Sequence, residues 1–194
     1  MRHLYNIFPF NRAWKYSTPA RADVGIGPYK GNELHSIYPA GSPPTSIRKD
    51  TVMVSLQALY DQAEQQNIPV LRGRMPACGS MSVQLPDGRC AIGLDSRPFT
   101  QPGERVHLGH ELGHCLTGSF YNIHSPADLR GRHENRADKW AIRRLIPVDQ
   151  LDDAIAAGHT ELWDLADYFG VTEPFLKKAL YLYIHGNLAA ELYF

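Results

Sequence analysis

The chain has 194 residues, 43% of them hydrophobic, which is enough for one hydrophobic core and short for two. Its 20 basic and 20 acidic residues cancel, so its charge indicates neither a nucleic-acid-binding protein nor a protein bound to an anionic membrane. No stretch has the length of a membrane span, and the first residues lack the apolar core of a secretion signal. We therefore expect a small cytoplasmic protein that makes no contact with a membrane and no direct contact with nucleic acid.

The three cysteines favour the same compartment. Cys78, Cys90 and Cys115 are odd in number and lack the C-x-x-C spacing of a redox or zinc motif. The sequence predicts that they are reduced thiols in a reducing compartment, with Cys78 to Cys90 as the only bridge that we consider.

Residues 1–50 form the first zone of the chain. They are rich in proline and glycine, yet they contain many aromatic side chains, namely Tyr5, Phe8, Phe10, Trp14, Tyr16, Tyr29 and Tyr38. Because disordered segments have few aromatic residues, we expect an irregular arm packed against the rest of the chain. The alternative is a flap that gates the functional cleft or contacts what binds there.

An amphipathic helix and a β-hairpin are predicted next. Residues 51–67 place apolar side chains on one helical face, namely Val52, Leu56, Leu59, Tyr60 and Ala63. Two alternating apolar runs flank a turn at residues 86–89, namely Met81, Val83 and Leu85, then Cys90, Ile92 and Leu94. We expect a short antiparallel sheet that buries the helix after it, offers an edge to an extended peptide, or does both.

A helix from Gln101 to Thr117 follows the hairpin. Thr100 is a suitable N-cap, and Gly118 is a suitable end. One stripe of this helix combines small or apolar residues with two histidines, namely Gly103, Val106, His110, His114 and Thr117. We therefore expect both imidazoles to point inward.

His110 and His114 lie one helical turn apart, so both rings can reach one metal ion. With Glu111 between them, the pattern H-E-x-x-H is typical of a zinc hydrolase, in which it supplies two ligands and a general base. One alternative is a pair of core histidines that donate to backbone carbonyls. Another is His107 as the first ligand, although that choice would leave Glu111 without a role.

A third ligand is expected on a helix of residues 132–146. Glu134 and Asp138 share a stripe with Ala141 and Leu145, within about 40° of one direction. A buried carboxylate stays ionised at little cost only beside a metal or a cation.

We therefore predict that Glu134 is the third zinc ligand and that Asp138 accepts the free ring N–H of a liganding histidine, His110. The alternative is a solvated face, on which the two acids pair with Arg130 or Arg143. The apolar neighbours on the stripe favour burial.

These residues resemble a known family, the ImmA/IrrE metallopeptidases. The family pattern is HExxH followed by E-x-x-A-N/D-x-F-A-x-x-L-L-M-P, and its counterparts here are His110-Glu111-Leu112-Gly113-His114, Glu134-x-x-Ala137-Asp138-x-Trp140-Ala141 and Leu145-Ile146-Pro147. The likeness extends loosely from residue 51 to residue 172 and does not reach residues 1–50. Trp140 and Arg144 replace the usual phenylalanine and leucine, which affects local packing and none of the proposed ligands.

The resemblance implies an intracellular, site-specific endopeptidase or a regulator of such an enzyme. Carried over to this chain, it implies that His110, His114 and Glu134 hold Zn²⁺ and that Glu111 is the base. Members typically relieve repression by cleaving a helix-turn-helix repressor of a phage or mobile element, so the implied partner is such a repressor. The alternative function is a metal-bound regulator that binds a repressor or another protein without cleaving it.

A donor to the oxyanion of the reaction is also expected. The candidates are Tyr121, His124, His133 and Tyr168, and the sequence does not choose among them.

Residues 147–194 are predicted to be helical, with Thr160 and Thr172 as N-caps and Gly170 between two apolar runs. This pattern resembles half of a helix-turn-helix, which raises a DNA-binding regulator as a rival class. Within residues 160–182, however, acids outnumber lysines, whereas phosphate contacts require the reverse.

The predicted architecture is an α+β, zincin-like metallopeptidase with a short antiparallel sheet packed on the HExxH helix. Its parts are the arm of residues 1–50, the metallopeptidase core of residues 51–147 and a helical C-terminal extension of the same domain, residues 148–194. The sequence leaves the oligomeric state open.

Overall fold

A computed structural model describes residues 53–75, 78–97, 99–122, 124–186 and 188. The elements in chain order are α2 (Leu56–Gln65), β1 (Val70–Gly73), β2 (Ser80–Gln84), β3 (Cys90–Asp95), α3 (Gln101–Thr117), α4 (Ala127–Leu145), α5 (Val148–Ala156), α6 (Leu162–Phe169) and α7 (Glu173–His185). A small sheet with a helical C-terminal part is the predicted α+β class. The arm predicted for residues 1–50 lies outside the described residues, as do residues 51 and 52 of the first predicted helix.

The sheet has the strand order β1-β3-β2. The predicted hairpin is present, since β2 and β3 pair antiparallel and Gly88 in the turn between them has a left-handed φ of 84°. The sheet is nevertheless mixed, because β1 pairs parallel to β3, with Val70 opposite Ile92. The sequence did not predict β1, which has only four residues.

The apolar residues of β2 face away from the core. Met81 and Val83 are 41% and 40% exposed, whereas Ser80 is buried. The strand register explains this orientation, because Ser80 lies opposite Leu94, and residues directly opposite each other share a face of the sheet. Leu94 is fully buried, so Ser80 points toward the interior, whereas Gln84 at the other end of β2 is exposed.

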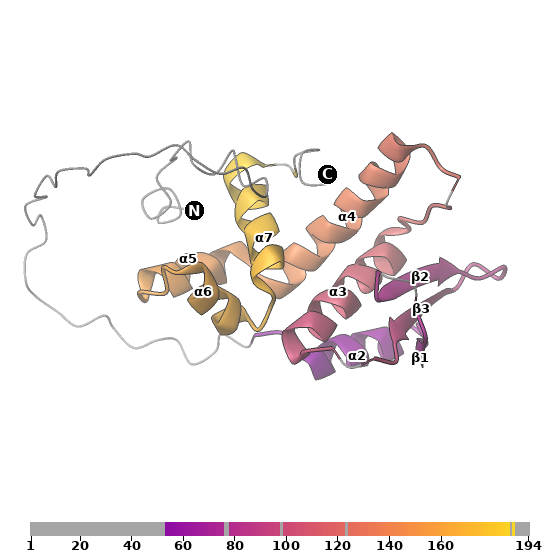
Figure 1. Cartoon of the computed structure of the whole chain (residues 1–194), viewed down its shortest axis with the longest axis horizontal. Helices are drawn as coiled ribbons and strands as arrows, with labels where there is room; N and C mark the ends of the chain where they lie inside the picture. Colours follow the sequence, from indigo (N-terminus) through magenta and orange to yellow (C-terminus); the bar gives the residue numbers. More distant parts are fainter. Residues whose placement is uncertain (1–52, 76–77, 98, 123, 187, 189–194) are drawn as a thin grey trace, which may run out of the picture.

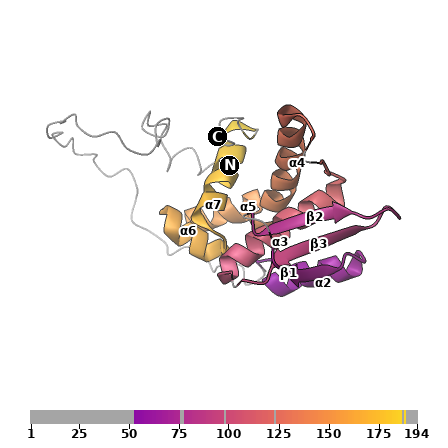
Figure 2. The ribbon, with the colours of Figure 1, turned by 45° about the vertical axis from the view of Figure 1, so that its right-hand side comes forward.

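Helix α3 is the central element of the fold. It contacts α4 and also α2, β2 and β3, and Figures 1 and 2 show it lying between the sheet and α4. Its bounds are those predicted: Thr100 accepts a hydrogen bond from the backbone N–H of Gly103 at 3.2 Å, and Gly118 ends the helix with a left-handed φ of 62°. Helix α4 begins five residues before the predicted start at residue 132 and ends before Pro147, as expected.

The C-terminal helices α5, α6 and α7 continue from α4, and α7 packs back against it. Gly170 ends α6 with a left-handed φ of 58°, and Thr172 is the N-cap of α7, both as predicted. The N-cap of α6 is Glu161 rather than the predicted Thr160. In the described part of the chain, no helix combines the length and the apolar character that crossing a membrane requires.

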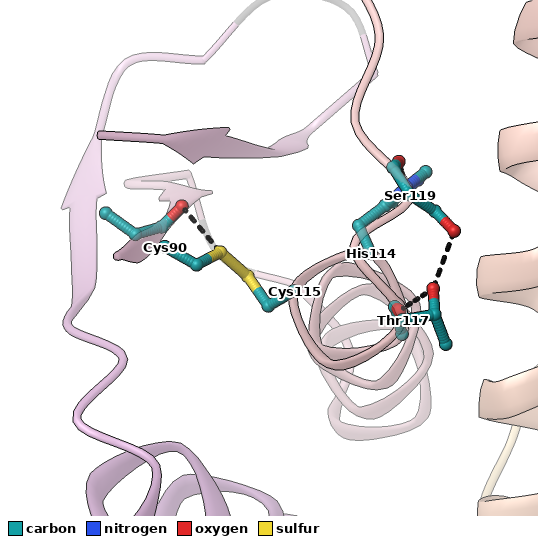
Figure 3. Close-up of a disulfide and its surroundings, with 7 residues drawn as sticks. Cys90, His114, Cys115, Thr117 and Ser119 are labelled. Atoms are coloured by element: carbon teal, nitrogen blue, oxygen red, sulfur yellow. Dashed lines mark hydrogen bonds between the residues drawn. A yellow bond between two sulfur atoms is a disulfide. The ribbon is translucent and has the colours of Figure 1, made fainter. Parts of the chain in front are cut away.

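A disulfide links the sheet to α3. Cys90 of β3 is bonded to Cys115 of α3, with their Cα atoms 5.7 Å apart, and Figure 3 shows the bond crossing between the two elements. The prediction of three reduced thiols is therefore wrong, and so is the bridge considered between Cys78 and Cys90, since Cys78 is free and exposed. Spacing along the sequence does not reveal that β3 packs directly on α3.

Candidate metal centre

Three side chains from α3 and α4 converge on one point. The Nε2 atoms of His110 and His114 are 3.0 Å apart. From α4, the two carboxylate oxygens of Glu134 lie 3.1 Å from Nε2 of His110 and 3.5 Å from Nε2 of His114. These are the three residues predicted to meet, and their possible ligand atoms all lie within 4.8 Å of one another.

The cluster fits a zinc ion. Zinc takes nitrogen and oxygen ligands at about 2.0 to 2.2 Å in a tetrahedron, so two of its ligand atoms are about 3.3 Å apart. The separations of 3.0, 3.1 and 3.5 Å bracket that value. Two imidazoles and one carboxylate are also the donor set of many catalytic zinc sites, which keep the fourth position open.

Hydrogen bonds orient both histidine rings toward Glu134. Nδ1 of His110 is 2.9 Å from Oδ1 of Asp138, the contact predicted from the sequence. Nδ1 of His114 is 2.6 Å from the backbone carbonyl oxygen of Ser119. With each Nδ1–H donating to these acceptors, both Nε2 lone pairs face the cluster.

Ser119 is not among the residues predicted from the sequence. Its position follows from Gly118, whose left-handed backbone reverses the chain after α3 and lets the next carbonyl reach His114. The hydroxyl of Thr117 is hydrogen-bonded to that of Ser119, as Figure 3 shows beside the disulfide. Gly118, directly after the HExxH helix, is the only sequence signal for the contact between His114 and the Ser119 carbonyl.

The electrostatics of the cluster favour a cation. Burial lowers the pKa of His110, but hydrogen bonds with Asp138 and Glu134 and the charges of Asp138 and Glu111 outweigh burial and raise that pKa to about 10. Burial raises the pKa of Glu134, but hydrogen bonds from the two histidines and Tyr121 hold it well below its usual range. Without a metal, the site therefore keeps a proton between two carboxylates, and a metal cation can take the place of that proton.

Asp138 also binds to the C-terminal helix. Its second oxygen, Oδ2, accepts a hydrogen bond from Nζ of Lys178 on α7 at 2.8 Å. Burial raises the pKa of Asp138, yet the contacts with His110 and Lys178 lower it below the ordinary value. The sequence does not predict this contact, because 40 residues separate Lys178 from Asp138 and only tertiary packing joins them.

Glu111, the predicted base, lies beside the cluster and is only 5% exposed. Its Oε1 accepts a hydrogen bond from the hydroxyl of Ser80 on β2 at 2.8 Å. The same hydroxyl lies 2.8 Å from Nδ1 of His107, so His107 contacts Ser80 and is not one of the three clustered residues. From the sequence, His107 is only a rival first ligand, and nothing in the sequence marks Ser80.

Of the four candidates for the oxyanion donor, Tyr121 is the one that contacts the cluster. Its hydroxyl donates to Oε1 of Glu134, and its ring centre is 6.2 Å from that of His114. The ring of His133 lies behind it, 6.1 Å away. Tyr168, on α6, packs against His159 in the loop before that helix, and His124 is exposed.

A two-histidine, one-carboxylate cluster beside a buried glutamate on an HExxH helix is an arrangement typical of metal-dependent hydrolases. The family model described as the IrrE N-terminal-like domain, a peptidase family, matches residues 63–181. The chain therefore belongs to this family, the ImmA/IrrE metallopeptidases that its motifs resemble. No curated protein matches the chain.

Proposed function

We propose that the protein is a zinc-dependent, site-specific endopeptidase. In this proposal His110, His114 and Glu134 hold the metal, and Glu111 is the general base. The observation that carries the proposal is that the two Nε2 atoms lie 3.0 Å apart, each within 3.5 Å of a carboxylate oxygen of Glu134, beside a buried glutamate.

The residues divide the chemistry between them. Bound zinc would polarise the scissile carbonyl and lower the pKa of water in its coordination sphere. Glu111 takes the proton of the attacking water and passes it to the leaving amine. The hydroxyl of Tyr121 donates to Glu134 in this structure, and it would turn from Glu134 to donate its one proton to the oxyanion.

Asp138 and Ser119 are assigned to orientation of the ligands. Each accepts the Nδ1–H of one histidine and so fixes which ring nitrogen faces the metal. Loss of either acceptor would let the ring rotate or change its tautomer.

The sheet supplies the support for the substrate. Strand β2 is an edge strand, and its first residue, Ser80, touches Glu111. An extended peptide that pairs with β2 would therefore run past the base and the metal, held by main-chain hydrogen bonds. Met81 and Val83, exposed on the same strand, offer apolar contact to substrate side chains that project to the outer face.

The substrate that we propose is a helix-turn-helix repressor of a phage or mobile element. This rests on the activity that is typical of the family. Since such a repressor acts in the cytoplasm, the proposal places the enzyme there.

The test is cleavage of repressors encoded near the gene, with intact mass as the readout. We expect zinc-loaded wild-type protein to cut one of them at a single bond and a chelator to stop the reaction. Glu111→Gln should abolish cleavage and keep full zinc, whereas Glu134→Ala should lose zinc. If Glu111→Gln keeps the biological effect of the wild-type protein, the chain acts by binding its partner and the peptidase proposal fails.

A further inference from the structure

A hydrogen-bonded chain joins Glu111 to two residues that the proposed chemistry does not use. The hydroxyl of Ser80 lies 2.8 Å from Oε1 of Glu111 and 2.8 Å from Nδ1 of His107. Ser80 and Glu111 are 6% and 5% exposed, so water cannot easily replace these contacts. Ser80 is on strand β2, and the other two residues are on helix α3. Ser80 is 27 residues from His107 and 31 residues from Glu111 in the sequence.

The donors and acceptors in this hydrogen-bonded chain follow from the number of protons that each side chain carries. A serine hydroxyl has one proton to donate, and an ionised carboxylate can only accept. A general base is ionised before it acts, so Ser80 donates to Glu111 and must accept from His107. His107 then carries its proton on Nδ1.

The surroundings of His107 hold its ring in place for that role. The ring packs against Phe99 with ring centres 4.7 Å apart. The left-handed backbone of Gly79 passes close by, and a Cβ there would lie 3.3 Å from the Phe99 ring and 3.5 Å from Cε1 of His107. Burial lowers the pKa of His107 despite the nearby charge of Glu111, which favours a neutral ring with one proton.

We propose that Ser80 and His107 are positioning residues for Glu111. They hold Oε1, so that Oε2 is left to accept the proton of the reacting water. The proposal rests on the proposed function, because it needs Glu111 to be the base. The hydrogen bond from Ser80 also fixes the base relative to β2, the strand along which we propose that the substrate binds.

The physical basis is the freedom of a glutamate side chain. A glutamate without a second contact samples several rotamers, and a misplacement of about 1 Å can cost about a hundredfold in rate. Ser80, held by strand β2, restricts the rotamers of Glu111 through its hydrogen bond. His107 in turn fixes the orientation of the Ser80 hydroxyl. Alanine at Ser80 would remove the hydroxyl that contacts both Glu111 and His107, so the kinetic test must separate a change in kcat from a general loss of structure.

The kinetic test uses Ser80→Ala, His107→Ala and the double variant, assayed on the cleaved substrate with zinc content as the control. We expect Ser80→Ala to lower kcat by about ten- to a hundredfold, with KM and zinc stoichiometry unchanged. In the Ser80→Ala background, His107→Ala should add little, because the chain is already broken. Ser80→Thr and His107→Asn keep the hydroxyl and the donor near Nδ1, and they should restore much of the rate.

An unchanged kcat in Ser80→Ala would overturn the proposal. So would independent, multiplicative losses from the two alanine variants, since these would show that the residues do not act through one chain. A loss that appears only in KM or in zinc content would indicate a structural role and would also overturn it.

A second measurement does not depend on activity. Nitrogen NMR of the ring of His107 in the zinc-loaded protein should show the proton on Nδ1, and Ser80→Ala should shift the ring toward the Nε2–H form. A wild-type ring protonated on Nε2 overturns the proposal whatever the enzyme does. If the ring is protonated on Nδ1 and the wild-type protein cleaves no peptide, it is the proposed function that fails, while the hydrogen-bond order stands.

Discussion

Gly113 of α3 lies directly against the backbone of Ala137 on α4. A Cβ at Gly113 would be 2.6 Å from the carbonyl oxygen of Ala137, a distance that no side chain tolerates. The glycine inside the HExxH motif therefore sets how closely the two helices approach. That approach is what brings Glu134 within 3.1 Å of His110.

Gly113→Ala should accordingly damage both the fold and the metal site. We expect a loss of about 1 to 3 kcal/mol in unfolding free energy from overpacking, together with weaker zinc binding as Glu134 moves away. The measurements are chemical denaturation of the metal-free protein and a competitive zinc titration. Gly131→Ala is the matched control, since nothing lies within 4 Å of that position on α4, and alanine there should be neutral or slightly stabilising.

Lys178→Met tests the link between α7 and the metal site. The change leaves Oδ2 of the buried Asp138 without its charged donor, so Asp138 should hold His110 less firmly. We expect zinc affinity to fall by about tenfold, within the range for partners of metal ligands. Lys177→Met is the control, because Lys177 is exposed on the same helix. Equal zinc affinities in the two variants would show that Lys178 does not support zinc binding.

The metal-free protein should become less stable as the pH rises. The pKa of His110 is raised to about 10 in the folded protein, against about 6.5 in an unfolded chain. The folded state therefore holds a proton that the unfolded state releases between these values. Its contribution is complete below about pH 6.5 and is lost as the pH approaches 10. Denaturation at pH 6, 8 and 9.5 should show this decline, and a flat profile would contradict it.

Zinc binding should release that same proton. At pH 7.5 we expect about one proton per zinc, because His110 must be neutral to bind the metal. Calorimetric titrations in two buffers of different ionisation enthalpy measure the number. An observed heat that is independent of the buffer would mean that no proton leaves.

The disulfide should contribute to stability through the unfolded chain. Closing a loop between residues 25 positions apart is worth about 3 kcal/mol in the loop-entropy account. Cys115→Ser, or reduction of the wild-type protein, should lower unfolding free energy by an amount of this order. Cys78→Ser should have no effect, since that thiol is free and exposed. If the oxidised wild-type protein and Cys115→Ser have equal unfolding free energies, the disulfide makes no such contribution.

Local signals made α3 predictable. Thr100 and Gly118 mark its ends, and the four-residue spacing of His110 and His114 requires only that the helix form. Glu134 could also be predicted from a local signal, because its stripe on α4 combines acids with core residues. The roles of these residues in catalysis remain predictions.

The features that the sequence missed depend on contacts between distant elements. Strand β1 is four residues long and becomes a strand by pairing in parallel with β3. Ser80, Ser119 and Lys178 have no periodic pattern of their own. Each acquires a role only because the fold brings it to a residue of the site: Ser80 to Glu111, Ser119 to His114 and Lys178 to Asp138. The disulfide was missed for the same physical reason.

The most direct test of the metal centre is an anomalous difference map at the zinc edge from crystals of the zinc-loaded protein. The account predicts one peak about 2.0 to 2.2 Å from Nε2 of His110, Nε2 of His114 and a carboxylate oxygen of Glu134. A peak bound by His107, or no peak between α3 and α4, would contradict it.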